Sequence, residues 1–159
     1  MSQYGVDTPD WHGLPWSWAA ERLAANKNFW VVTVSATGRP HALPVWGVWD
    51  DDEHRFMFSC APAARKAANI AQNPQVVVAI DDTVHCVSIE GRAASIDDDA
   101  RRTAWVERYL TKYRPYSEEL SGEFLASHGM YEVVPDRAFG IVEEDDAFAT
   151  RATRWAFGD

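Results

Sequence analysis

Two adjacent cations, Arg65 and Lys66, are the residues whose type and position point most directly to chemistry. They follow a strand-like run ending at Cys60 and stand in the first turn of a helix expected from Pro62. The free N–H groups and dipole of a helix N-terminus favour anions, so neighbouring cations there cost stability. A phosphate or other anion held by backbone donors, the Arg fork and the Lys charge would explain the pair. The alternative is a solvated pair of cations.

The other reactive side chains form no known catalytic or metal-binding pattern. None of the five His residues stands at metal-ligand spacing from another His, Cys or carboxylate, so no metal is expected. Ser59, Ser88 and Ser95 lack a nucleophile elbow, and the glycines form neither a GxGxxG nor a Walker loop. Cys60 and Cys86 stand in apolar runs without CxxC spacing and are expected to be buried thiols. The catalytic residues therefore stay unassigned.

Strands and short helices would position the Arg-Lys pair. A helix is expected from an N-cap at Ser17 to Asn26, and a second helix from Pro62 at its first position through Ala71. The runs 29–35, 41–49 and 55–60 are rich in β-branched and aromatic residues and predict strands, the first two joined by a turn at 37–40.

The second half of the chain continues this alternation. Strands are expected at 76–80 and 84–95, with Gly91 marking a bulge or a close approach. Acidic residues 97–99 would cap a helix that places apolar side chains on one face, which is expected to pack in a core or interface: Trp105, Val106, Tyr109, Leu110 and Tyr113. A second helical piece at 117–128, strands at 130–134 and 138–143, and an irregular tail complete the expectation.

Length and composition restrict the class of protein. The 159 residues suit one domain, and 47% hydrophobic residues with eight Trp provide a core. A net charge of −9 repels phosphate backbones and anionic lipid, which argues against nucleic-acid binding. No apolar run approaches the roughly 20 residues of a membrane span, and the N-terminus lacks the features of a secretory signal, so a cytoplasmic location is expected. We expect one mainly β domain over residues 1–159, a barrel with peripheral helices.

Several segments, taken in order, carry a family resemblance. They are Trp-Val-Val-Thr-Val at 30–34, the run 38–49 that contains Pro-Val-Trp-Gly-Val-Trp, the run 65–74, the run 87–93 and Ala-Thr-Arg-Trp at 152–155. Together they resemble the pyridoxamine 5'-phosphate oxidase-like, split β-barrel flavin and deazaflavin oxidoreductases. The Trp-Ser-Trp start at 16–18, the Pro-Val-Trp strand and the tail look most like the actinobacterial branch that uses coenzyme F420, an 8-hydroxy-5-deazaflavin; some relatives there bind FMN.

The resemblance implies an FMN-binding split β-barrel that forms a homodimer, with two cofactor sites at the subunit interface. It implies an N-terminal arm at 1–15, a helical insertion at 97–128 and a tail at 144–159 that packs near the cofactor. The cofactor-binding residues it implies are Ser59, Cys60, Arg65 and Lys66 for the phosphate, Pro44, Val45 and Trp46 for the ring, and Arg154 and Trp155 from the partner chain's tail. Core or dimer packing is the alternative for Trp46 and Trp155.

Departures from the true pyridoxine-phosphate oxidases shift the expected cofactor. Those enzymes carry an Arg and a Lys on the second strand, where this sequence has Ala42 and Gly47. They also carry a Ser where this sequence has Ala64, and a Gln at about the position of Cys86. Losing the substrate-phosphate Lys makes oxidation of pyridoxine phosphate unexpected. Losing several FMN contacts favours the deazaflavin.

The expected function is therefore an F420-dependent oxidoreductase that transfers a hydride between the deazaflavin and a small conjugated or electron-poor molecule. The 97–128 segment would line the substrate side, with Tyr109, Tyr113, His128 or solvent as the proton source. The alternatives are an FMN-dependent oxidoreductase of the same family and a non-catalytic protein that binds F420, flavin or haem.

Overall fold

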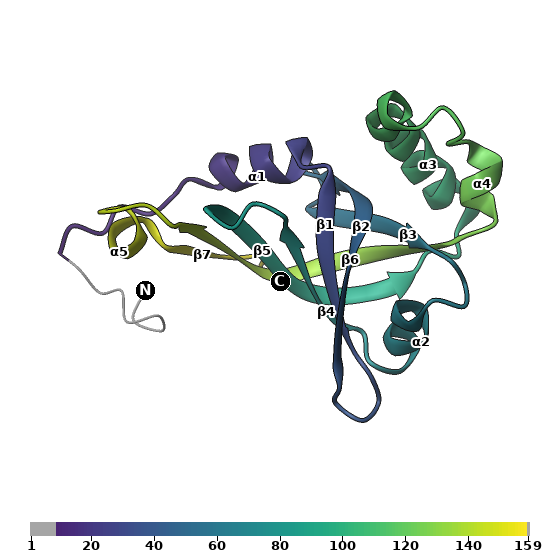
Figure 1. The fold of residues 1–159 in the computed structure, drawn as a ribbon, viewed down its shortest axis with the longest axis horizontal. Helices are drawn as coiled ribbons and strands as arrows, with labels where there is room; N and C mark the ends of the chain where they lie inside the picture. Colours follow the sequence, from purple (N-terminus) through teal and green to yellow (C-terminus); the bar gives the residue numbers. More distant parts are fainter. Residues whose placement is uncertain (1–8, 159) are drawn as a thin grey trace.

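Seven antiparallel strands form the frame of the protein, and a computed structural model describes residues 9–158 of it (Figure 1). The elements are α1 (Trp16–Ala25), β1 (Asn28–Val34), β2 (Pro40–Asp50), β3 (Arg55–Cys60), α2 (Arg65–Gln72), β4 (Gln75–Ile80), β5 (His85–Ser95), α3 (Asp99–Tyr113), the 3-10 helix η2 (Arg114–Tyr116), α4 (Gly122–Ala126), β6 (Gly129–Val142), α5 (Phe148–Arg151) and β7 (Thr153–Ala156).

The strands close into a barrel. Their order is β3-β2-β1-β4-β5-β6-β7, and β3 also pairs with β6, so six strands form a closed antiparallel barrel. The remaining strand, β7, extends the sheet beyond β6. The expectation of a mainly β barrel with peripheral helices is confirmed.

The barrel interior is filled by alternate side chains of the strands. On β1, Phe29, Val31 and Thr33 are fully buried, whereas Trp30 between them is 44% exposed. This alternation follows from the period of two in a β-strand. The helix α1 adds Leu23 to the same core. None of the helices over residues 9–158 is long and apolar enough to cross a membrane.

The first helix begins two residues earlier than predicted. The helix α1 begins at Trp16, and Pro15 rather than Ser17 is the capping residue. Pro15 adopts φ −67° and ψ 153°, and its carbonyl accepts a hydrogen bond from the Trp18 N–H at 3.1 Å. Proline is suited to this place because its fixed φ suits an extended residue and its missing N–H costs nothing there.

The second helix, in contrast, starts later than predicted. A turn precedes it, in which the Ala64 N–H donates to the Ala61 carbonyl at 2.9 Å. Pro62 is the second residue of that turn, where proline is favoured, and not the first residue of the helix. The helix α2 begins at Arg65, so Arg65 and Lys66 are its first two residues and the prediction that they stand in its first turn is confirmed.

The end of the chain is more regular than expected. The two strands predicted at 130–134 and 138–143 are one continuous strand, β6, because Pro135 pairs opposite Gly91. The register shifts between Glu90 and Gly91, where Asp136 of β6 is the extra residue. The bulge at Gly91 is thereby confirmed. The tail is not irregular, since residues 148–151 form α5 and residues 153–156 form β7 on β6. The predicted arm at 1–15 lies partly outside the described residues.

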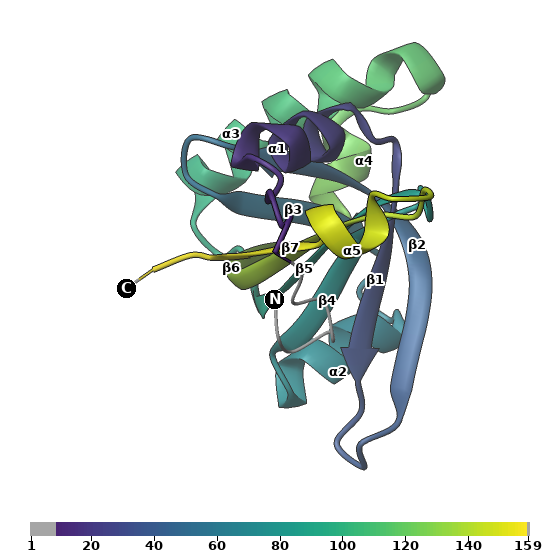
Figure 2. The same ribbon diagram turned by 90° about the vertical axis from the view of Figure 1, so that its left-hand side faces the viewer.

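The segment between β5 and β6 folds as the helices α3, η2 and α4. The Asp98 side chain caps α3 by accepting a hydrogen bond from the Arg101 N–H at 2.7 Å. The predicted inward face is confirmed, because Trp105, Tyr109 and Tyr113 are buried. In Figure 1, α3 and α4 lie above the end of β3 and α2 lies below it; Figure 2 again shows them on opposite sides of the barrel strands.

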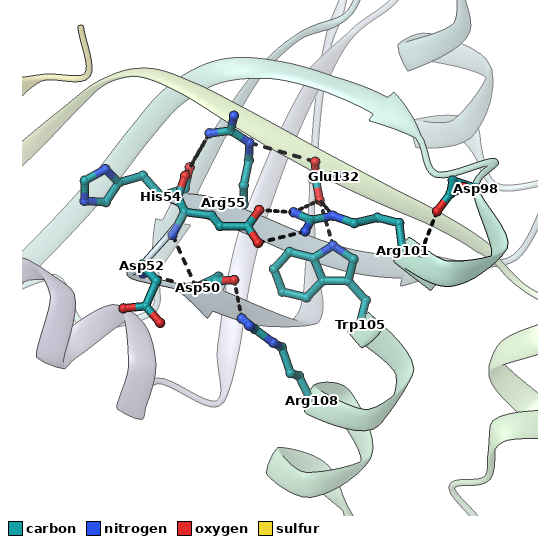
Figure 3. A network of polar contacts seen from close by, with 10 residues as sticks. Asp50, Asp52, His54, Arg55, Asp98, Arg101, Trp105, Arg108 and Glu132 are labelled. Atoms are coloured by element: carbon teal, nitrogen blue, oxygen red, sulfur yellow. Dashed lines mark hydrogen bonds and ion pairs between the residues drawn. The ribbon is translucent and has the colours of Figure 1, made fainter. Parts of the chain in front are cut away.

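A network of ion pairs attaches α3 to the outside of the barrel (Figure 3). Arg101 of α3 pairs with Glu132 of β6 and with Glu53, in both cases at 2.7 Å. The Trp105 indole donates to Glu132 at 2.7 Å, and Arg108 pairs with Asp50 at the end of β2. The hydrogen bond from Arg101 lowers the pKa of Glu53. The helix is thus held on two strands by charged groups at its side.

Candidate functional site

A cavity of about 530 Å³ lies where the barrel meets α2 and the helical segment. Six of the nine residues expected to bind a cofactor line it: Pro44, Val45 and Trp46 of β2, Ser59 and Cys60 of β3, and Lys66 of α2. These residues come from separate stretches of the chain, and they meet because β2 pairs with β3 and the chain turns directly from β3 into α2.

The β2 wall of the cavity is held by a tyrosine from α3. The Trp46 ring is stacked on Tyr113, with ring centroids 4.6 Å apart and an interplanar angle of 3°. The Tyr113 hydroxyl accepts from the Gly47 N–H at 2.8 Å and lies within donating distance of the Lys27 and Gly47 carbonyls. Burial raises the pKa of Tyr113. Trp46 therefore presents a fixed aromatic side chain to the cavity.

Lys66 is the cation of this cavity. Its side chain is only 7% exposed, and no ion pair or hydrogen bond joins its ammonium group to another described residue. No side chain caps α2, whose capping residue is Ala64. A buried ammonium group without an acidic partner is costly to a folded protein. The combination of this charge with open backbone donors at a helix start is typical of an anion site.

Cys60 lies beside this lysine in the cavity wall. Its thiol is buried, which raises its pKa, and the charge of Lys66 offsets part of this shift. A raised pKa keeps the thiol protonated and poorly nucleophilic. Cys86 is half-buried on β5, and both cysteines are free thiols. Among residues 9–158, no group of three His, Cys, Asp or Glu side chains is placed to hold a metal ion.

The structure separates three of the expected cofactor residues from this cavity. Arg65 lines a different cavity of about 330 Å³, on another side of α2 from Lys66. Arg154 and Trp155 belong to β7, and Trp155 packs against Trp16 with ring centroids 5.4 Å apart. Arg154 and Trp155 therefore line neither cavity of their own chain. The expectation for these two residues concerned the cavity of a partner chain.

The helical segment forms the opposite wall, which the cofactor prediction did not include. Its contributing residues are Tyr109, Ser117, Glu119, Leu120, Phe124 and His128. Of the segment 97–128, which was expected to line the substrate side, only Tyr109 and residues after α3 line this cavity. The Trp105 and Tyr113 side chains instead lie in a hydrophobic core. The helical periodicity around Tyr109 indicated a buried face, but no local pattern indicated that residues 117–128 return to β2.

Two side chains of this wall carry protons. Burial, with a smaller effect of the neighbouring Tyr113, raises the pKa of the Tyr109 hydroxyl well above its usual value. Nδ1 of His128 lies 2.7 Å from the Phe124 carbonyl oxygen, which can only accept, so this nitrogen carries a proton in the hydrogen-bonded form. In the neutral ring the other nitrogen, Nε2, is then the acceptor.

Known proteins share this architecture. The sequence model of the pyridoxamine 5'-phosphate oxidase family matches residues 18–139, more than half of the chain. An FAD-binding protein from Mesorhizobium loti superposes with a TM-score of 0.61 at 19% identity, over 79% of this chain and 92% of that one. A conserved hypothetical protein from Mycobacterium tuberculosis gives 0.65 at 16% identity, over 83% and 86%.

A third similar structure belongs to a protein with a storage role. HutZ, the haem storage protein from Vibrio cholerae, superposes with a TM-score of 0.53 at 19% identity, over 75% of this chain and 85% of that one. No protein of curated function matches the sequence. At these identities the likeness to solved structures shows a common fold. Together with the match of the sequence model, it leads to one conclusion: the chain belongs to the pyridoxamine 5'-phosphate oxidase family.

Proposed function

We propose that the protein binds a flavin-type cofactor in the 530 Å³ cavity, with coenzyme F420 preferred, and transfers a hydride between it and a small conjugated or electron-poor molecule. The observation that carries the proposal is Lys66, a buried cation without an acidic partner at the uncapped start of α2. It faces the same cavity as the fixed Trp46 ring. A phosphate on a planar aromatic cofactor offers one group to each of these features.

The residues of the cavity suit the binding and orientation of such a cofactor. Lys66 and the first N–H groups of α2 would hold the phosphate, and β2 would lie along the ring, where Pro44 leaves an edge without an N–H donor. The cofactor supplies the hydride chemistry when it is bound. The chain's own residues position it and keep water out. His128 and Tyr109 stand on the substrate side as the groups able to move a proton.

The proposal includes a second copy of the chain. Trp30 is 44% exposed and pairs opposite Pro44 on β2 and Ala79 on β4, so these three side chains share the outer face of the sheet. Pro44 also lines the cavity. A homodimer formed through this apolar face would cover the open side of the cavity, and it would let the partner's tail, with Arg154 and Trp155, close over the ring.

Storage or transport of a bound cofactor is the second candidate function. His128 lines the cavity, and imidazole groups are ligands of haem iron. HutZ, which shares the fold, is described as a haem storage protein. In this case the protein would bind F420, a flavin or haem without turnover.

Side-by-side titrations separate these functions. F420 and FMN binding is followed by fluorescence and haem binding by absorbance, with size-exclusion light scattering to give the subunit number. Bound reduced F420 is then mixed with enones and quinones in a stopped-flow instrument. F420 binding with reoxidation by an acceptor supports the proposal. A tighter complex with FMN makes the protein a flavin enzyme, binding without reoxidation leaves the carrier function, and failure of all three titrations refutes cofactor binding.

A further inference from the structure

One buried hydroxyl group in the wall of the 530 Å³ cavity has no partner in the protein. Tyr109 of α3 is 5% exposed and lines this cavity, and no hydrogen bond joins its hydroxyl to another residue among 9–158. Tyr113, one turn further along α3, is different, because its hydroxyl bonds to the main chain of Gly47 and Lys27. Buried tyrosine hydroxyls usually have a partner, so that of Tyr109 has to be a molecule in the cavity.

The Tyr109 hydroxyl is open to the cavity, and the ring that carries it is fixed. The enclosed side-chain atoms that lack a partner belong to other residues, among them His41, so the Tyr109 oxygen is not sealed off by protein. The Tyr109 ring contacts the Tyr113 ring at a centroid distance of 4.8 Å, and Tyr113 is in turn stacked on Trp46 at 4.6 Å. The donor is therefore held in place before any ligand binds, which favours electrostatic stabilisation of a reacting group.

The Tyr109 hydroxyl keeps its proton. Burial, with a smaller contribution from Tyr113, raises the pKa of this hydroxyl well above its usual value. A phenol with a raised pKa gives up its proton reluctantly, but it remains a hydrogen-bond donor over the whole neutral pH range. Tyr109 is therefore suited to stabilise negative charge that develops on a ligand, whereas proton delivery is left to His128 or to water.

We propose that Tyr109 donates a hydrogen bond to the carbonyl oxygen of the hydride acceptor, and that the acceptors are neutral α,β-unsaturated ketones or aldehydes. This inference rests on the proposed function. The β-carbon of the acceptor bonds to the hydride of the reduced cofactor, the electron pair of the C=C bond shifts towards the carbonyl group, and the oxygen becomes an enolate oxygen. The α-carbon then takes a proton from His128 or water, so one acceptor, one hydride and one proton give a saturated carbonyl compound. The hydrogen bond from Tyr109 strengthens as charge develops on the oxygen.

The neighbours of Tyr109 in the helical wall indicate the rest of the acceptor. Leu120 and Phe124 line the same cavity and offer apolar contact to a hydrocarbon body. Glu119 also lines it, and its carboxylate would repel an acceptor that carries a carboxylate of its own. The wall therefore favours a neutral unsaturated ketone or aldehyde over an unsaturated acid.

The test compares the wild-type protein with Tyr109→Phe and with a control, Tyr116→Phe. Tyr116 is exposed and lines neither cavity, so the control removes a hydroxyl of the same kind from a different place. The neutral probe is benzylideneacetone and the charged probe is cinnamate. Difference infrared spectroscopy measures the C=O stretch of bound benzylideneacetone, with and without F420, and stopped-flow kinetics measures reduction of both probes by reduced F420.

The C=O stretch of bound benzylideneacetone should lie at a lower frequency in the wild-type protein and Tyr116→Phe than in Tyr109→Phe. Tyr109→Phe should lower kcat on the order of 100-fold and raise KM by less than about tenfold, and cinnamate should be reduced more slowly than benzylideneacetone. Because the Tyr109 hydroxyl has no partner in the described chain, its removal should leave the urea midpoint unchanged, which separates this role from a structural one.

The outcomes separate this inference from the proposed function. If no cofactor binds but the C=O stretch differs between the wild-type protein and Tyr109→Phe, the carbonyl site stands and the proposed function fails. If benzylideneacetone reoxidises F420 equally fast in both proteins, the proposed function stands and the role of Tyr109 is overturned. An equal C=O stretch in both proteins, or neither binding nor reduction of benzylideneacetone, overturns that role as well.

Discussion

Replacing Lys66 by Met should move stability and binding in opposite directions. In the free protein Lys66 is 7% exposed as a residue and its ammonium group has no acidic partner, so folding carries the cost of removing part of a charge's hydration. A Met side chain of similar length fills the same space without this cost. Because the ammonium still faces a cavity, we expect the low end of the usual range, a gain of about 1 kcal/mol in the free energy of unfolding.

Cofactor binding should become weaker in the same variant. A hydrogen bond between Lys66 and a phosphate oxygen is worth about 1.5–3 kcal/mol, which corresponds to a loss of roughly 10- to 100-fold in affinity. Urea unfolding of the free protein measures the first effect, and fluorescence titration with F420 and FMN measures the second.

A second lysine serves as a control. Lys112 is also largely removed from solvent, but its ammonium donates to the Gly47 carbonyl at 3.0 Å and lines neither cavity. Lys112→Met should therefore change stability without a comparable loss of affinity. The reasoning is refuted if Lys66→Met binds the cofactor as tightly as the wild-type protein, or if both variants lose affinity equally.

Three further predictions concern the frame of the site. Burial lowers the pKa of Lys112 from 10.5 to about 8. Below pH 8 the ammonium is charged in both the folded and the unfolded protein. Between about pH 8 and pH 10 the folded protein loses this proton while the unfolded protein keeps it, so the free energy of unfolding should rise by about 1–2 kcal/mol. Urea unfolding across this range should show no such rise in Lys112→Met. Tyr113→Phe leaves the buried Gly47 N–H without its acceptor, which should cost about 1–3 kcal/mol and weaken cofactor binding by loosening the Trp46 wall; unfolding and titration of one preparation measure both. Gly91→Ala places a Cβ atom 2.2 Å from a carbonyl oxygen of β6 and should cost about 3 kcal/mol in thermal unfolding. The control is Gly122→Ala, whose Cβ would meet nothing closer than 3.9 Å.

Local signals in the sequence were sufficient for most of the barrel and for the place of Arg65 and Lys66. The strand-like run before Cys60 and the Asn73-Pro74 stop bracket one short helix, so the pair must stand near its start. Which side chain faces which cavity was not predictable. Consecutive residues of a helix differ by about 100° in direction, and the helix begins three residues later than Pro62.

Contacts between distant segments escaped prediction for a different reason. The strand β7 is four residues long and is stabilised by pairing with β6 and by Trp155 packing over Gly140. No periodicity can be read from so short a segment. The wall formed by Phe124 and His128 likewise depends on how α3 is attached to the barrel, and that attachment uses ion pairs such as Arg101 with Glu53, 48 positions apart in the sequence.

The helical wall enters and leaves the barrel at one point. Ser95 at the end of β5 pairs opposite Tyr131 near the start of β6, and the Ile96 N–H donates to the Met130 carbonyl at 2.9 Å. A tight hairpin turn would join two strands at this separation equally well. The pairing of β5 with β6 therefore does not depend on the length of the stretch between them. The part after α3 can vary in length and sequence to admit new substrates, while Tyr113 of α3 keeps its place against Trp46.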